Sequence, residues 1–253
     1  MRQHRFFVGQ DLSKFLGQNP AVFDFDPDTT DFEPKDAIVS HQHEIIRQWK
    51  KVFRYEPGAE VILFDGKIEY EAKILELSKK DETARLVLEK EVRATHNDKT
   101  GVWLGLAILK GEHTDMVIEK ATELGVRGVI LFQSDRVVKK GVNLERLRKI
   151  AIEAAEQCGR IDVPTIDVCG NIEELLNKDS FDQKVILDMD GERVKGSTKE
   201  NTLICIGPEG GWSDDERKIF KARKDVVIES LGENVLRAET AAILGAGALY
   251  LKF

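Results

Sequence analysis

The N-terminal part of the chain contains short stretches in which apolar residues run together or alternate with polar ones. Residues 6–8 and 61–64 are apolar runs, and the second is followed at once by Asp65-Gly66 and by the alternating residues 68–74. An apolar run, an Asp-Gly pair and an alternating run together predict a β-hairpin. Residues 85–92 alternate in the same way. We therefore predict a small β-rich unit at this end, a compact barrel or sandwich.

From residue 102 onward the hydrophobic pattern changes to buried strands that alternate with helices. In residues 114–124, for example, Val117, Ala121 and Leu124 recur at helical spacing, and Gly125 supplies a C-terminal stop. Strands and helices in alternation predict a mainly parallel sheet with helices on both faces. The predicted strands are 102–109, 126–132, 184–188, 202–206 and 226–231, and the predicted helices are 114–124, 143–157, 213–223 and 238–253.

The composition is that of an ordinary globular protein with room for two domains. The chain has 253 residues, of which 42% are hydrophobic and 33% charged, so disorder is not expected. Residues 94–101 are polar and turn-prone, as a linker would be. No apolar stretch is long enough to cross a bilayer, and the N-terminus lacks the apolar run of a signal peptide. We therefore expect a cytoplasmic protein with no membrane partner.

Cysteine and histidine usage favours neither disulfides nor a metal. Cys158, Cys169 and Cys205 form no C-x-x-C pair and lie among apolar neighbours, so we expect buried small side chains rather than reactive thiols. The five histidines include no pair at helical i, i+4 spacing with carboxylate support. We expect no metal site.

The distribution of charge bears on nucleic-acid binding. A formal net charge of −7 argues mildly against it, although the local arrangement decides. Residues 24–36 carry six acids against one lysine, and we expect them to form a solvated loop. The following segment can either meet a phosphate backbone and stack on bases or form an amphipathic helix with a solvated cationic side. Its basic residues are Arg47, Lys50, Lys51 and Arg54, and its aromatic residues are Trp49, Phe53 and Tyr55.

Two strand-loop-helix segments near the C-terminal end carry the candidate chemistry, because open α/β sheets bind ligands beyond the carboxyl ends of their strands. The first is Gly207-Pro208-Glu209-Gly210-Gly211, followed by Ser213 and Glu216 at capping-box spacing. No lysine follows the last glycine, so this is not a P-loop, and the surrounding acids would repel a polyphosphate. The loop suits a ligand with a cationic centre, such as S-adenosylmethionine, or is a plain tight turn before a well-capped helix.

The second segment, residues 231–242, again ends a strand in glycine and enters a helix. That helix is rich in small residues, and each glycine in it weakens an isolated helix by roughly 1 kcal/mol. A tight contact is the expected compensation, either within the domain or at a subunit interface. Arg237 and Glu239, at the start of the helix, are a surface pair or site residues.

These segments belong to a series of motifs through which the chain resembles a known family. In order they are HRFFV (4–8), VFR (52–54), LFDG (63–66), EKATELGV (119–126), EAAEQCGR (153–160) with Val163-Pro164, GPEGGWS (207–213) and LGENVLRAETA (231–241). Their number, order and spacing resemble the bacterial RsmE family of 16S ribosomal RNA uridine-N3 methyltransferases, in the SPOUT superfamily.

The resemblance implies an α/β fold: a SPOUT-type α/β domain with a C-terminal trefoil knot, preceded by a small PUA-like β-barrel. It places the RNA-binding barrel in residues 1–75 and the methyltransferase domain with its cofactor-binding knot in residues 76–253. It also implies a homodimer with the active site close to the subunit interface, and 16S ribosomal RNA within the 30S subunit as the partner. The knot is not something that the residue pattern shows, since folds generally avoid threading.

The resemblance also implies roles for individual residues. Arg237, Glu239 and Thr240 lie in the family's LR-x-ET motif and are the expected catalytic residues. The residues expected to bind the cofactor S-adenosylmethionine are Leu187, Ile206, Gly207, Glu209, Gly210, Gly211, Leu231, Gly232, Asn234, Val235 and Leu236. Those expected to bind RNA are Arg2, His4, Arg5, Arg47, Lys51 and Arg54.

The expected reaction needs the proton of uridine N3 to leave beside the methyl donor. Arg237 would stabilise the negative charge on the base, and Glu239 would either accept the proton or orient Arg237. Two alternatives are a SPOUT methyltransferase acting on another ribosomal or transfer RNA position, and a non-catalytic RNA-binding assembly factor. The intact GPEGG and LR-x-ETA segments favour a working enzyme.

Overall fold

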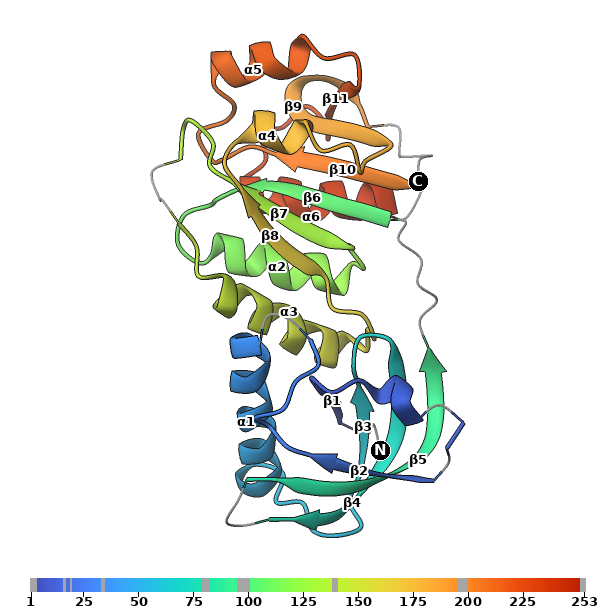
Figure 1. Ribbon diagram of the computed structural model, residues 1–253. Coiled ribbons are helices and arrows are strands. Elements are labelled where there is room, and N and C mark those ends of the chain that lie inside the picture. The colour runs from blue at the N-terminus through green and yellow to red at the C-terminus, as the bar shows by residue number, and fades with distance from the viewer. Residues whose placement is uncertain are drawn as a thin grey trace. The chain divides into compact units, whose positions relative to one another are not determined.

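The computed structural model describes residues 4–15, 17–18, 20–32, 35–78, 82–94, 101–137, 141–194 and 200–250 (Figure 1). The chain divides into two compact units. The first comprises Met1–Asp98 and Ala155–Val163, and the second comprises Lys99–Ala154 and Pro164–Phe253. The domain boundary that we expected after residue 75 therefore lies later, between residues 98 and 99. It lies later because strand β5 (Ala84–Ala94) pairs with two strands of the first unit.

The first unit contains a five-stranded sheet in the order β1-β3-β4-β5-β2. The predicted hairpin is confirmed, because β3 and β4 are antiparallel and joined by a turn in which Gly66 has a φ of +92°. The Asp65 carboxylate fixes this turn by accepting the backbone N–H groups of Lys67 and Ile68, each at 2.8 Å. The remaining bounds in this unit are β1 (Arg5–Phe7), β2 (Ala21–Phe25), β3 (Glu60–Phe64), β4 (Ile68–Leu77), the 3-10 helix η1 (Leu12–Phe15) and α1 (Lys35–Lys51).

The acidic segment expected to be a loop begins inside a strand. In β2, Ala21, Phe23 and Phe25 are buried while Val22 and Asp24 point outward, so period-two alternation overrides the acidic composition. Beyond the loop, α1 packs Ile45, Ile46 and Trp49 into the core of the first unit. The amphipathic-helix alternative is thus confirmed for residues 35–51.

The second unit contains a six-stranded sheet in the order β11-β9-β10-β6-β7-β8, in which every neighbouring pair is parallel. The predicted strands are all present, and β8 and α4 are additional elements that the hydrophobic pattern did not identify. The strands are β6 (Gly101–Ala107), β7 (Gly128–Phe132), β8 (Thr165–Cys169), β9 (Gln183–Arg193), β10 (Asn201–Ile206) and β11 (Val226–Ser230). The helices are α2 (His113–Glu123), α3 (Leu144–Cys158), α4 (Ile172–Leu176), α5 (Asp214–Lys221) and α6 (Ala238–Tyr250).

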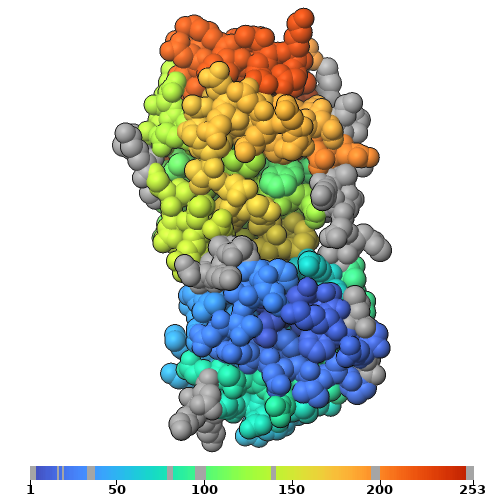
Figure 2. Space-filling view, in the orientation of Figure 1, coloured from blue at the N-terminus to red at the C-terminus, as the bar shows by residue number. Residues whose placement is uncertain are grey.

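Helices cover both faces of this sheet, as predicted. Along β10, Leu203 and Cys205 share a core cluster with Leu175 of α4. The intervening Ile204 faces α6, which packs so closely that a Cβ on Gly245 would lie 3.7 Å from Ile204. Figure 1 shows α4 in front of the sheet and α6 behind it. Helix α5 lies at the surface of the unit (Figure 2) and buries one side, which includes Phe220.

Candidate active site

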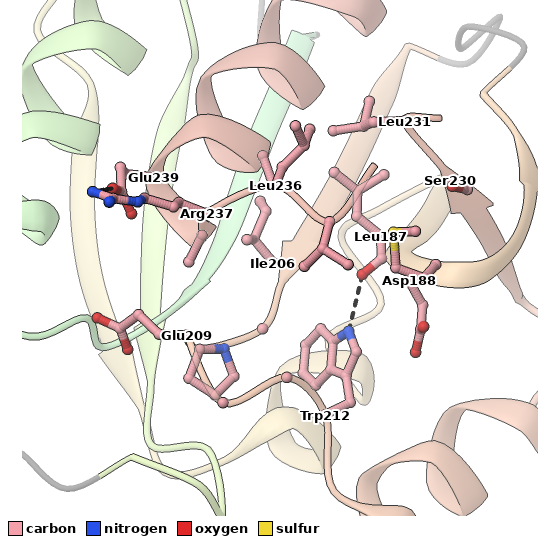
Figure 3. Close-up of a pocket in the computed structure, with 18 of the residues that line it drawn as sticks. Leu187, Asp188, Ile206, Glu209, Trp212, Ser230, Leu231, Leu236, Arg237 and Glu239 are labelled. Atoms are coloured by element: carbon pink, nitrogen blue, oxygen red, sulfur yellow. Dashed lines mark hydrogen bonds and ion pairs between the residues drawn. The ribbon is translucent and has the colours of Figure 1, made fainter. Parts of the chain in front are cut away.

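A cavity of about 690 Å³ lies beside the carboxyl end of β10 (Figure 3). Its walls come from the end of β10 and the glycine loop after it, from β9 near Leu187, from the loop after β11, and from the start of α6. The expected cofactor-binding residues lie around this one cavity, with the exception of Gly232. The lining residues that the sequence indicated are Leu187, Ile206, Gly207, Glu209, Gly210, Gly211, Leu231, Asn234, Val235, Leu236, Arg237 and Glu239.

The glycine loop forms one wall and is held by its neighbours. Gly211 has a φ of +69°, a conformation that side-chain-bearing residues rarely adopt. A Cβ on Gly207 would meet the Trp212 ring at 3.0 Å. The loop then enters α5 through a capping box, in which Ser213 accepts the N–H of Glu216 and the Glu216 carboxylate accepts the N–H of Ser213. The capping predicted from the sequence is confirmed.

Trp212 joins the glycine loop to β9. Its indole Nε1 donates a hydrogen bond of 2.9 Å to the carbonyl oxygen of Leu187, and both residues are buried. The ring also stacks parallel to Phe132, with centroids 6.0 Å apart. Sequence reasoning missed Trp212 as a lining residue. The signal available was a single large aromatic residue directly after three glycines.

The loop after β11 forms the opposite wall. Its turn is fixed by Ser230, whose hydroxyl donates to the carbonyl of Gly232 at 2.9 Å and accepts the Gly232 N–H at 3.3 Å. Gly232, with a φ of +144°, therefore shapes the loop without lining the cavity. Leu231 and Leu236 face the cavity together with Leu187, as Figure 3 shows. Val235 lies at the edge with 85% of its surface exposed.

Charged groups gather where α6 begins. The Arg237 side chain is 82% exposed, whereas the Glu239 side chain is only 10% exposed. Glu239 Oε1 lies 4.0 Å from a guanidinium nitrogen of Arg237 and 3.4 Å from Nδ1 of His113, the first residue of α2. Nearby, the carboxylate of Glu209 accepts the backbone N–H of Lys110 at 2.9 Å. Thr240, expected to be catalytic, is not among the residues that line the cavity. Its catalytic role stays a prediction.

A second charged group lines the cavity and was not predicted. Asp188 directly follows Leu187, and its side chain is only 4% exposed. Arg217 of α5 lies 3.0 Å from Asp188 and 2.8 Å from Asp190, so the buried carboxylate is neutralised. These residues are separated by the whole of β10 and the glycine loop, and local sequence pattern gives no sign that they meet.

The residues expected to bind RNA lie in the first unit and differ in accessibility. Arg47, Lys51 and Arg54 are exposed. His4 is exposed too, and its ring lies 4.3 Å from that of Phe53. Arg2 is outside the described residues.

Arg5 and Trp49 are not available for this role. The Arg5 side chain is 10% exposed and forms an ion pair with Glu69, and burial lowers its pKa despite that pair. The expectation that Arg5 binds RNA is corrected, because its charge is already neutralised inside the unit. Trp49 is fully buried and cannot stack on a base.

Two of the three cysteines are buried as predicted, whereas Cys158 is only partly buried. Cys169 and Cys205 are in the sheet core of the second unit. Burial raises the pKa of Cys169 to about 11 and raises that of Cys205 further, so both thiols stay protonated at neutral pH. Among the described residues, no helix has the length and apolar character to span a membrane.

The chain matches known proteins over both units. Residues 96–250 match the model of a family described as an RNA methyltransferase domain, and residues 50–87 match one described as an RNA methyltransferase PUA domain. The ribosomal RNA small subunit methyltransferase E of Rickettsia conorii is 33% identical over 216 residues, which cover 83% of this chain and 86% of the relative.

Two solved structures share the fold over nearly the full length. The ribosomal RNA small subunit methyltransferase E of Neisseria gonorrhoeae, bound to S-adenosyl methionine, has a TM-score of 0.80 and 25% sequence identity. A methyltransferase from Legionella pneumophila, in complex with the bound cofactor SAM, gives the same two values. Each comparison covers 99% of this chain and 98% of the other.

Proposed function

The chain belongs to the ribosomal RNA small subunit methyltransferase E family of RNA methyltransferases, and we propose that it methylates N3 of a specific uridine in 16S ribosomal RNA with S-adenosylmethionine as the donor. The observation that carries the proposal is the cavity between the glycine loop and the loop after β11. Two relatives of known structure that are similar over nearly the whole chain contain this cofactor.

The residues that line the cavity suit this cofactor. Leu187, Ile206 and Leu236 supply an apolar lining for an adenosine group. The carboxylates of Glu209 and Glu239 line the same cavity and supply negative charge that can attract a sulfonium cation. When bound, S-adenosylmethionine supplies an electrophilic methyl group, and its sulfur takes the electron pair of the broken carbon–sulfur bond.

Three functions fall to the chain itself. Glu239 accepts the proton of uridine N3, so that the nitrogen lone pair is free to form the new bond. Arg237, whose guanidinium is exposed at the cavity, stabilises the negative charge that develops on the base. The two walls hold the donor in line with N3, and such orientation alone accounts for a large part of many enzymatic accelerations.

The first unit selects the RNA in this proposal. The match to a PUA domain and the exposed side chains of Arg47, Lys51 and Arg54 support that role. We further propose that this unit is a PUA-like β-barrel, that the C-terminal part of the second unit forms a trefoil knot, and that the protein works on the 30S subunit in the cytoplasm. We propose in addition that the protein is a homodimer whose partner subunit covers the cavity edge at Val235.

The decisive experiment is methyl transfer to 30S subunits from cells that lack the modification, followed by nucleoside mass spectrometry. We expect N3-methyluridine as the product. Another methylated nucleoside would overturn the assignment of the base. Titration calorimetry with S-adenosylmethionine separates a working enzyme from a non-catalytic binding protein, since no binding at high micromolar concentrations would contradict the enzyme.

A further inference from the structure

The Glu239 carboxylate is buried, and a buried carboxylate needs a partner to stay ionised and in place. Among the described residues, the basic groups within 4.0 Å of it are His113 and Arg237. His113 is the nearer, at 3.4 Å against 4.0 Å. Arg237 is also the more exposed of the two, since its side chain is 82% exposed and that of His113 is 41% exposed. The geometry therefore gives His113, rather than Arg237, the position from which to hold Glu239.

His113 is fixed by the fold on which it sits. It is the first residue of α2, which packs against α6, the helix that carries Glu239 in its first turn. Its ring lines the cavity, and its Nδ1 atom is buried with no well-formed hydrogen bond. The 3.4 Å approach to Glu239 is longer than a good hydrogen bond. Contacts of this kind in ligand-free active sites commonly tighten when substrate binds.

We propose that His113 is a positioning residue of the methyl transfer: with a proton on Nδ1, it holds the Glu239 carboxylate against α2. This inference rests on the proposed function and deepens it. While Glu239 is held by His113, its Oε1 atom stays 4.0 Å from the Arg237 guanidinium, too far for a hydrogen bond, and the guanidinium keeps its hydrogen-bond donors for the uridine base. Without His113, the carboxylate would pair with Arg237, and both groups would leave the positions that the reaction requires.

Two substitutions of His113 separate the effect of the hydrogen-bond donor from that of the side chain's bulk. In His113→Asn, the amide nitrogen lies where Nδ1 lies in histidine, so a donor to Glu239 is retained. In His113→Leu, a side chain of similar bulk has no donor. A hydrogen bond to a charged group is worth enough that we expect His113→Leu to lower kcat about tenfold or more. His113→Asn should recover most of that loss.

A double-substitution cycle with Glu239→Gln tests whether His113 acts through Glu239. In the Glu239→Gln background, His113→Leu should change kcat by less than about twofold, because the carboxylate that it positions is gone. Cofactor affinity, measured by calorimetry, and KM for the RNA should change little in any variant. Glu123→Gln, at the far end of α2, is the matched control and should leave all these values unchanged.

The outcomes separate the inference from the proposed function. A wild-type protein that transfers no methyl group to 30S subunits overturns both. An active wild type with unchanged kcat in His113→Leu overturns the positioning role alone. The positioning role is also overturned if the loss of kcat in the double variant equals the product of the losses in His113→Leu and Glu239→Gln. If His113→Leu folds poorly, seen as a lowered Tm, His113→Ala takes its place as the variant without a donor. An unchanged kcat in His113→Ala overturns the positioning role.

Discussion

The indole nitrogen of Trp212 donates a 2.9 Å hydrogen bond to the backbone carbonyl of Leu187, and this bond ties the glycine loop to strand β9 across the base of the cavity. The two residues lie 25 positions apart in sequence and contribute to different walls. A buried carbonyl that loses its donor costs about 1–3 kcal/mol. The bond therefore stabilises the fold and sets the distance between two sides of the cofactor cavity.

Removing this donor while keeping an aromatic ring tests the link. We expect Trp212→Phe to lower the free energy of unfolding by about 1–3 kcal/mol and to weaken S-adenosylmethionine binding, because Leu187 loses its buried partner. Urea denaturation and calorimetry measure the two effects. Trp103→Phe, in β6 of the same unit but outside the cavity, is the control and should leave cofactor affinity unchanged. Equal affinities for S-adenosylmethionine in wild type and Trp212→Phe would show that cofactor binding does not depend on this hydrogen bond.

Two glycines of α6 make a matched pair. Alanine normally favours a helix over glycine by about 1 kcal/mol. A Cβ on Gly245, however, would lie 2.7 Å from Leu187 Cδ1, whereas a Cβ on Gly247 would meet nothing within 4 Å. We expect Gly245→Ala to displace Leu187 and weaken cofactor binding, and Gly247→Ala to leave binding unchanged. Calorimetry measures the cofactor affinity of both variants. Equal affinities would contradict the close packing of Gly245 against Leu187.

Arg237 is expected to act on the substrate rather than on the cofactor. Arg237→Ala should reduce kcat about a hundredfold, a typical loss when one charge-stabilising group is removed, while cofactor affinity stays near that of wild type. Single-turnover methyl transfer and calorimetry give the two quantities. Arg146→Ala, also an exposed arginine of the second unit, serves as control. Turnover unaffected by Arg237→Ala would remove this residue from the mechanism.

The ion pairs at Asp225 should make stability depend on pH. Hydrogen bonds from Arg223 and Lys184 hold the Asp225 pKa well below its usual value, and the Lys184 side chain is buried. A depressed carboxyl pKa stabilises the fold above the unfolded value of about 3.9 and loses that effect as pH falls below it. We therefore expect Asp225→Asn to be less stable than wild type at pH 7.

Half of the Asp225 side chain is exposed, so solvent screening keeps this difference to about 1 kcal/mol. Urea unfolding at pH 7 and at pH 3 measures it, and the gap should shrink at the lower pH. Asp215→Asn removes a fully exposed pair with Lys218 and should have little effect at either pH. A gap that widens in acid would contradict the assigned direction.

RNA binding should depend on the exposed cations of the first unit. We expect Arg47→Glu combined with Lys51→Glu to weaken binding to 30S subunits and to reduce the salt dependence of affinity by about 0.7–0.9 per lost phosphate contact. Filter binding over a range of salt concentrations measures both. Lys90→Glu reverses an exposed charge elsewhere in the same unit and should change affinity little. Affinity and salt slope equal to those of wild type would place the RNA surface elsewhere.

Local sequence signals carried much of the fold. The Asp65-Gly66 hairpin, the strands from β6 to β11 other than β8, and the Ser213 capping box follow from short-range patterns that tertiary contacts did not override. Strand β8 was missed because only Ile166 and Cys169 of its five residues are buried, so it forms no apolar run. Helix α4 has five residues, too few for a helical period to show. Strand β2 was hidden because Asp24, on its outward face, belongs to the acidic segment that we expected to be a loop.

The residues of the candidate site likewise fall into those with a local sequence signal and those without one. The two loops were identified because glycine and capping residues mark a strand-to-helix turn locally. Arg5 was misjudged because its partner, Glu69, lies 64 positions away. His113, Asp188 and Arg217 were missed for a similar reason, since only the order of strands in the sheet brings them to the same cavity as the loops. Contacts between residues so far apart produce no periodic pattern in the sequence.

Helix α6 follows every other lining element in chain order, and this order has a consequence for biosynthesis. A nascent polypeptide leaves the ribosome from its N-terminus, so the glycine loop and β11 emerge before the residues that complete the cavity, up to Ala241. A growing chain therefore has no complete cofactor site at any earlier stage. Cofactor binding then stabilises only molecules in which α6 has docked. It therefore favours the completely folded protein over chains in which this last helix is not in place.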